Sequence, residues 1–391
     1  MISSLQARRN LLYQSIVTFV VLSGLQLSTW LPLRYWKAWG GGNFLDTWQI
    51  LRYGKCYETV GLSVYENIGT NCSNYLYGRT LLQLISFLGV DTTQTQILGY
   101  IFLVLLAVGL TLIFPIQNRR DFLLFLAVLL SPPIMLLADR GNFDILIFLV
   151  LILVAKSVSR ANFYLAFCLL TLTVLMKYYT APVFLVVIFF TKIPKERILG
   201  AALFLASTGF AIRDILITQT QYPHGSEAQF GFSVWGEYLN NFSSTQVNQV
   251  QKYALSAIVF SIVFFIVLLS TQKLQLNRVN FIEITTWRFY AFWIFLTVSI
   301  SCYFGGMNFD YRLIYLATTL LLASRVLINF NTRALIESLV IFLWLSFPSG
   351  GLQPLGDLFI EIIVAYCFVC LMLEVKRKLK ITFTSKIGEA Q

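Results

Sequence analysis

Long apolar stretches follow one another along the chain and are separated by short polar gaps. In Ile101–Pro115 and Ala254–Ser270, for example, nearly every residue is apolar. Runs of roughly 17–25 apolar residues match the thickness of the hydrocarbon core of a bilayer. The pattern predicts an all-α polytopic membrane protein with about 12 (10–13) transmembrane helices. We expect them near residues 10–32, 95–116, 121–138, 144–157, 161–177, 180–192, 198–217, 253–271, 289–304, 312–328, 334–347 and 357–374.

Two longer polar segments interrupt this pattern, and we expect the whole chain, residues 1–391, to form a single integral membrane domain. The first segment, residues 33–94, contains a short apolar piece at Thr80–Val90 that is too short to span and predicts an interfacial helix. The second segment, residues 218–252, is long enough to serve as a lid over a binding site.

Composition agrees with a membrane location. Hydrophobic residues make up 57% of the chain and charged residues 12%, against about 25% charged in a typical soluble domain. The net charge of +11 does not indicate nucleic-acid binding, because the basic residues lie in short gaps between apolar runs. We expect no nucleic acid among the partners.

The distribution of charge predicts which loops face the cytoplasm. If the N-terminus is inside, the inner gaps hold 19 of the 29 basic residues and a net charge of +13, and the rest of the chain carries −2. The positive-inside rule therefore favours cytoplasmic N- and C-termini. It also places both long polar segments on the non-cytoplasmic side, and we expect the protein in a bacterial inner or plasma membrane.

Charged residues gather at the predicted non-cytoplasmic ends of the helices. They lie at Asp46, in Asp139-Arg140-Gly141-Asn142-Phe143-Asp144, in Lys177-Tyr178-Tyr179 and in Asp310-Tyr311-Arg312. Each group alone has a structural explanation, since such residues form ion pairs, cap helices or extend to the interface. Their convergence on one face instead indicates a site for a phosphorylated substrate.

Transfer chemistry at such a site needs a base and cations. A carboxylate removes the proton of an acceptor hydroxyl, and Asp46 is our candidate for this catalytic role. Cations hold a phosphate leaving group, for which the candidates are Arg140, Lys177, Arg312 and His224, the single histidine. A lone loop histidine is more often solvated than catalytic.

The sequence also gives information on a disulfide, a metal site and a nucleotide-binding loop. Cys56 and Cys72 both lie in the first long segment, where an oxidising compartment would permit a disulfide, although the sequence alone leaves their pairing open. No cluster has the spacing of a metal site, and no glycine-lysine loop for ATP is present. We expect no cofactor and no metal.

Two of these segments resemble a known superfamily. Asp139–Asp144, followed one helix later by Lys177-Tyr178-Tyr179-Thr180-Ala181-Pro182, is similar to motifs of the GT-C membrane glycosyltransferases. The similarity is strongest to the bacterial polyprenyl-phosphate-mannose-dependent α-mannosyltransferases. It covers roughly residues 40–190, including the Tyr75–Arg79 stretch, and Thr180 and Ala181 depart from the pattern by separating the aromatic pair from Pro182.

The resemblance implies a GT-C-like bundle and a transferase that moves a sugar, mannose or another hexose or pentose, from a polyprenyl-phosphate carrier to a glycan or glycolipid acceptor. It places the catalytic acid in the first long segment, at Asp46. We assign substrate contacts to Asn142, Asp144, Tyr178, Tyr75, Arg79 and Asp310. Membrane lipids complete the expected partners.

Two alternatives stay open at this stage. A transporter or flippase for lipid-linked glycans would need charges along a path through the bundle, where few are present. A polysaccharide polymerase or ligase would use a pyrophosphate-linked donor.

Overall fold

The computed structural model describes residues 2–27, 43–65, 72, 79–218, 229–230, 249–273, 286–304, 308–326, 355, 357–366 and 368–369. This part of the chain is almost entirely helical, as the sequence predicts. Two two-residue strands, β1 (Gln229–Phe230) and β2 (Asn308–Phe309), form one antiparallel pair.

The first half of the described chain contains nine α-helices. They are α1 (Ile2–Leu27), α3 (Leu45–Val60), α4 (Arg79–Leu88), α5 (Thr95–Ile113), α6 (Arg119–Leu129), α7 (Pro132–Arg140), α8 (Asp144–Ser159), α9 (Phe163–Met176) and α10 (Val183–Phe190). After them come α11 (Pro194–Thr218), α13 (Gln249–Lys273), α14 (Trp287–Phe304) and α15 (Ile314–Val326). Short 3₁₀ helices lie at η1 (Gly61–Tyr65), η2 (Thr92–Gln94), η3 (Tyr178–Thr180) and η4 (Asp310–Leu313).

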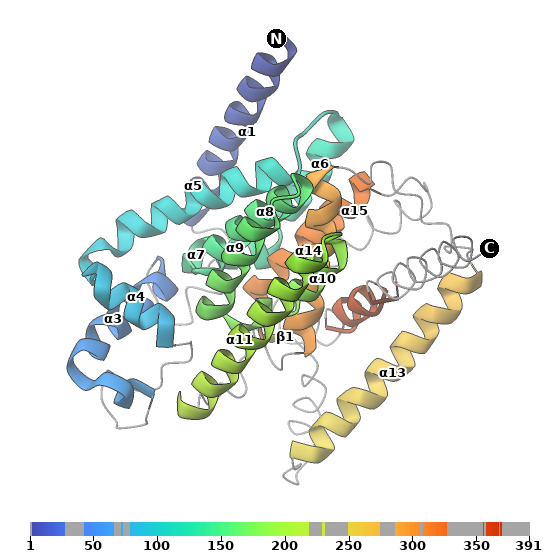
Figure 1. Ribbon diagram of the computed structural model, residues 1–391. Helices are drawn as coiled ribbons and strands as arrows, with labels where there is room; N and C mark the ends of the chain where they lie inside the picture. Colours follow the sequence, from blue (N-terminus) through green and yellow to red (C-terminus); the bar gives the residue numbers. More distant parts are fainter. Residues whose placement is uncertain are drawn as a thin grey trace.

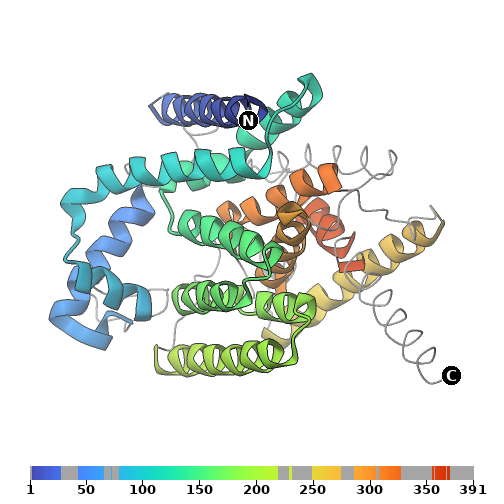
Figure 2. The same cartoon turned by 45° about the horizontal axis from the view of Figure 1, so that its top comes forward.

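Neighbouring helices pack in a row. α1 packs on α5, α5 on α8, α8 on α9 and α9 on α11, as the stacked helices in Figure 2 show. α14 packs against both α8 and α15 and closes one side of the row (Figure 1). Large side chains such as Phe148, Phe295 and Trp293 are almost fully buried at this junction. This junction belongs to one continuous hydrophobic core that also includes residues of α5, α7, α9 and α10.

The apolar stretch at 121–138, predicted as one helix, contains most of α6 and most of α7. These two helices meet at an angle of 56°. The cause is local: Ser131 precedes Pro132 and Pro133, and proline lacks the N–H that a continuous helix needs. The span expected at 121–138 is therefore broken into two helices.

Helix length bears on the predicted membrane spans. In the described residues, the 22-residue segment Thr92–Ile113 is long and apolar enough to cross a bilayer, and the bent pair α6–α7 would be a second span. Other apolar helices are shorter, among them α9 with 14 residues and the 13-residue α15. The number of twelve spans therefore stays a prediction.

The segment before α5 contains more structure than the sequence predicted. The interfacial helix expected at Thr80–Val90 is present as α4, but the preceding α3 was not foreseen. α3 packs against α4, where a Cβ on Gly54 would lie 2.4 Å from a methyl group of Ile85. A close approach of these helices therefore requires glycine at position 54.

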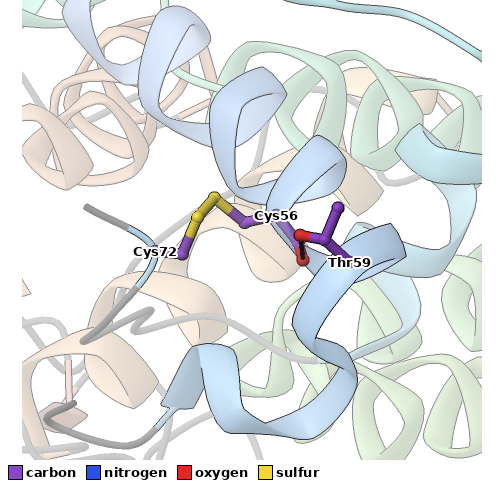
Figure 3. Close-up of a disulfide and its surroundings, with 3 residues drawn as sticks. All are labelled: Cys56, Thr59 and Cys72. Carbon is purple, nitrogen blue, oxygen red and sulfur yellow. Dashed lines mark hydrogen bonds between the residues drawn. A yellow bond between two sulfur atoms is a disulfide. The ribbon is translucent and has the colours of Figure 1, made fainter. Parts of the chain in front are cut away.

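A disulfide joins Cys56 to Cys72 and settles the pairing that the sequence left open (Figure 3). Their Cα atoms are 5.5 Å apart, a normal separation for the bond. The hydroxyl of Thr59 donates to the backbone carbonyl of Cys56 at 2.9 Å, within the last turns of α3 (Figure 3). The bridge ties the segment after η1 back to α3.

The start of η2, the 3₁₀ turn that leads into α5, is capped by a short polar motif. The Asp91 carboxylate accepts hydrogen bonds from the backbone N–H and the hydroxyl of Thr93, and Gln94 bonds back to the Asp91 N–H. These bonds from Thr93 lower the pKa of Asp91, because they favour its charged form. The motif satisfies N–H groups that the first helical turn leaves unpaired.

Candidate active site

Asp46 lies in the first turn of α3 and is almost completely buried. Its Oδ1 is 2.7 Å from Nε of Arg140, and its Oδ2 accepts a hydrogen bond from the side-chain amide of Asn142. A carboxylate is favourable at this position because the N-terminus of a helix carries partial positive charge. Asp46 is thus held by partners from the connection between α7 and α8.

Close backbone contact positions Asp46 against that connection. Phe44 adopts a left-handed conformation and its N–H donates to the carbonyl of Asp139 at 2.8 Å. The hydroxyl of Thr47 donates to the carbonyl of Gly141. The Phe44 ring lies so close to Gly99 that a Cβ there would come within 2.1 Å of it. The N-terminus of α3 is therefore fixed on α5 and α7.

Gly141 allows this approach and ends α7. Its φ of +56° is a left-handed conformation, which favours glycine and is common just after a helix. A Cβ at this position would lie 2.8 Å from both Phe44 and the Thr47 hydroxyl oxygen. The turn carries Arg140 on one side and Asn142 on the other, so both reach Asp46.

Asn142 links two parts of the site and is fully buried. Its side-chain oxygen accepts from the backbone N–H of Asp144 at 2.8 Å and from Nζ of Lys177 at 3.1 Å. Because that oxygen has two donors, the amide NH₂ is directed to Asp46. One amide therefore connects the α3 carboxylate with the charges around Asp144.

Asp144, the first residue of α8, is the centre of a buried polar cluster. Its carboxylate oxygens lie 2.9 Å from Nζ of Lys177 and 3.4 Å from Nε of Arg312, and Oδ1 accepts from the Tyr179 hydroxyl at 2.5 Å. Tyr315 bonds to the backbone oxygen of Asp144 and lies 2.8 Å from the Tyr179 hydroxyl. A buried charge is costly unless it is paired in this way.

The linked group contains more cations than carboxylates. Arg140, Lys177 and Arg312 face Asp46 and Asp144, which leaves an excess of one positive charge among these five residues. The side chain of Arg140 is 21% exposed and that of Arg312 is 12% exposed, whereas Lys177 is 2% exposed. The two arginines are therefore the more accessible cations of the group.

A second cluster adjoins the first through η3. The hydroxyl of Tyr178 donates to the buried carboxylate of Asp214 in α11, and the backbone N–H of Arg79 donates to the same group at 2.9 Å. Nε of Arg79 lies 3.9 Å from Asp214. Tyr178 and Arg79, both predicted to contact substrate, are therefore anchored on Asp214.

The structure brings together six of the predicted residues, contributed by four parts of the chain. They are Asp46, Arg140, Asn142, Asp144, Lys177 and Arg312. Tyr75 and His224 lie outside the described residues, as does most of the predicted lid at 218–252. Asp310 belongs to η4, but its side chain is also outside the described part.

Three participants were not predicted: Tyr179, Tyr315 and Asp214. A signal existed for Asp214, because a carboxylate within an apolar helix is expensive and usually has a partner. Tyr179 lies in the motif Lys177–Pro182, which was a signal, although no role was assigned to it. Tyr315 carries no such signal, since tyrosine is common in apolar helices of any kind. Among the described residues, no group of three or more His, Cys, Asp or Glu residues has an arrangement that could hold a metal ion.

Comparison of the chain with protein families, curated proteins and solved structures finds no match.

Proposed function

We propose that this chain is an integral membrane glycosyltransferase that moves a sugar from a polyprenyl-phosphate carrier to a glycan or glycolipid acceptor. The observation that carries the proposal is the Asp46 carboxylate, joined through Asn142 to a buried group of cations at one end of the helix bundle. The apolar composition and the long helix Thr92–Ile113 support a membrane location.

In the proposed reaction Asp46 is the general base. It takes the proton of the acceptor hydroxyl while the hydroxyl oxygen bonds to the anomeric carbon of the donor sugar. Both Asp46 oxygens already accept from Arg140 and Asn142, but a carboxylate has about four acceptor positions and retains room for the acceptor O–H. The two contacts orient the carboxylate before the acceptor arrives.

The bond between the anomeric carbon and the phosphate oxygen breaks in the same step, and polyprenyl phosphate leaves with its electrons. Arg312 and Arg140, the partly exposed cations, would contact the phosphate. Lys177 is buried and would stabilise the negative charge of the phosphate without touching it. Donors that are already in place stabilise developing negative charge without further reorganisation. In this proposal Asp144 holds Lys177 and Arg312 together, so that it acts on the substrate through these two cations.

The disulfide supports a non-cytoplasmic site. Cys56 lies on the same helix as Asp46, and disulfides persist in oxidising compartments but rarely in the cytosol. The charge distribution independently predicts that the first long segment lies outside. The donor sugar would therefore be presented from the outer leaflet, which is where an acceptor glycan on that side could meet it.

The test is transfer by purified protein supplied with a panel of polyprenyl-phosphate sugars and, in a separate arm, pyrophosphate-linked glycans. Asp46→Asn keeps the size of the side chain but removes the base, so we expect turnover to fall about 10²–10⁴-fold. Arg312→Gln should chiefly weaken donor binding and raise KM. Asp91→Asn, on an exposed cap of η2, is the matched control and should transfer normally.

Thermal unfolding of each variant separates loss of chemistry from loss of fold. Normal turnover by a folded Asp46→Asn protein would remove Asp46 from its role. Transfer from pyrophosphate-linked donors alone would favour a polymerase or ligase. Absence of transfer by the wild-type protein from every polyprenyl-phosphate sugar would overturn the proposal.

A further inference from the structure

A pocket of about 680 Å³ lies at the opposite end of α5 from the charged site. It is bordered by α1, α6 and the connection Pro115–Gln117. Gly99 of α5 contacts Phe44 at the charged site, whereas Ile113 precedes the pocket. Fourteen residues of helix separate these two points, a distance of roughly 20 Å at 1.5 Å per residue. The pocket is therefore distinct from the candidate active site.

One end of the pocket is polar. Gln14 of α1 donates to the carbonyl of Phe114 at 3.1 Å and accepts from the N–H of Ile116 at 3.0 Å, which ties α1 to the end of α5. Arg288, at the start of α14, donates to the carbonyls of Leu112 and Ile113 at 3.3 Å. Gln14 and Arg288 both line the pocket, so its polar groups gather around the end of α5.

The walls leading away from that end are apolar. Along α1 the lining passes from Asn10 and Gln14 to Val17 and Val21, and along α6 it continues from Phe122 to Leu129. The other apolar lining residues are Leu11, Tyr13, Pro115, Ile116, Phe125 and Leu126, and Thr18 adds one hydroxyl on the α1 side. Its volume is within the range of roughly 300–1,000 Å³ found for ligand pockets. A polar end joined to an apolar length fits an amphipathic ligand.

The surrounding charges indicate the sign of the polar part of that ligand. Arg288 is the charged lining residue, and three exposed arginines, Arg9, Arg119 and Arg120, lie next to lining segments. The nearby carboxylate of Asp121 forms an ion pair with Arg325 at 2.6 Å. Clustered arginines beside an apolar surface attract anionic lipid headgroups.

From this arrangement we infer that the pocket binds an anionic phospholipid, with an acyl chain between α1 and α6 and the headgroup phosphate near Arg288. By the predicted topology this end of the bundle faces the cytoplasm, where anionic lipids and basic residues meet. α1 packs mainly on α5. The bound lipid would contact both α1 and α6 and so stabilise their relative position. The inference does not depend on the proposed transferase activity.

The test uses delipidated protein in detergent and native mass spectrometry with added phosphatidylglycerol or phosphatidylcholine of the same acyl chains. One arginine near a headgroup should favour phosphatidylglycerol by about fivefold. Val17→Trp fills the pocket from α1 and should abolish that binding. Val20→Trp is the matched control, because Val20 is 60% exposed on the same helix and does not line the pocket.

Two further arms define the ligand. Arg288→Gln should remove the preference for phosphatidylglycerol but leave acyl-chain binding. Excess glycerol phosphate should not displace the lipid, since most of the lining is apolar. Equal binding of the two lipids by the wild-type protein, full retention by Val17→Trp, equal loss in Val20→Trp, or displacement by glycerol phosphate would each overturn the inference.

Discussion

At Gly141 a single hydrogen atom in place of a side chain lets α3 approach the end of α7. We expect Gly141→Ala to be destabilising for two reasons. A left-handed alanine costs roughly 1–2 kcal/mol, and overpacking against Phe44 and Thr47 adds about 1–3 kcal/mol. The shift would also move Asp46 relative to Arg140, so transfer activity should fall along with stability.

Gly89 supplies the control for this prediction. Its φ of +62° is also left-handed, but a Cβ there would meet nothing within 4 Å. Gly89→Ala should therefore show the conformational cost alone. Thermal and denaturant unfolding of both variants would measure the difference, and equal destabilisation would show that the contact of Gly141 with α3 is unimportant.

At this scale the sequence predicts which residues gather but not how they contact one another. Arg140, Lys177 and Arg312 lie at ends of apolar segments, and consecutive helices that run in opposite directions bring such ends to one face. Asp46 lies in the polar segment that the predicted topology puts on the same face. The buried position of Asp144 could not be foreseen, because its partners come from η3, η4 and α15. The bridging role of Asn142 likewise depends on tertiary packing.

At the scale of helices and loops, the disulfide between Cys56 and Cys72 holds α3 to the segment that precedes α4. It closes a loop with a sequence separation of 16 residues, and the chain-entropy model gives about 3 kcal/mol for such a loop. We expect Cys56→Ser to lower the stability of the α3–α4 region by about this amount. Reductant should have a similar effect on the wild-type protein.

Unfolding in detergent with and without reductant measures this contribution. Cys168→Ser is the matched control, because Cys168 is an exposed free cysteine on α9 and its removal should change little. An unfolding midpoint that is insensitive to reductant in the wild-type protein would contradict the prediction. Proteolysis of the α3–α4 region should accelerate when the bridge is lost.

The apolar pattern alone predicts that a helix is present more accurately than it predicts where the helix begins, bends or is capped. α4 follows from the short apolar run after Arg79, whereas α3 has little apolar character and was missed. The bend between α6 and α7 has a readable cause in Pro132 and Pro133, which the apolar pattern does not weigh. Glycine contacts such as that of Gly54 are visible only once the helices are packed.

Across the whole molecule, the helices place different side chains at their two ends. One end holds the linked group around Asp46 and Asp144, and the other holds Arg325 with Asp121 and the pocket beside Arg288. On α11, Lys195 is exposed near the first turn and Asp214 is bound to Tyr178 near the last turn. These positions are roughly 28 Å apart along the helix, close to the hydrocarbon thickness of about 30 Å.

This separation makes the predicted topology testable. In a background in which Cys168, Cys302, Cys367 and Cys370 are replaced by serine, we would introduce Gln96→Cys, at the start of α5 near the charged site, or Lys195→Cys. An impermeant thiol reagent applied to right-side-out vesicles should label position 96 at once, because the site end faces outward in our proposal. Position 195 should react only after the vesicles are opened. The reverse pattern would place the charged end in the cytoplasm, where Cys56 and Cys72 would meet reducing conditions, and the proposed outward site would be wrong.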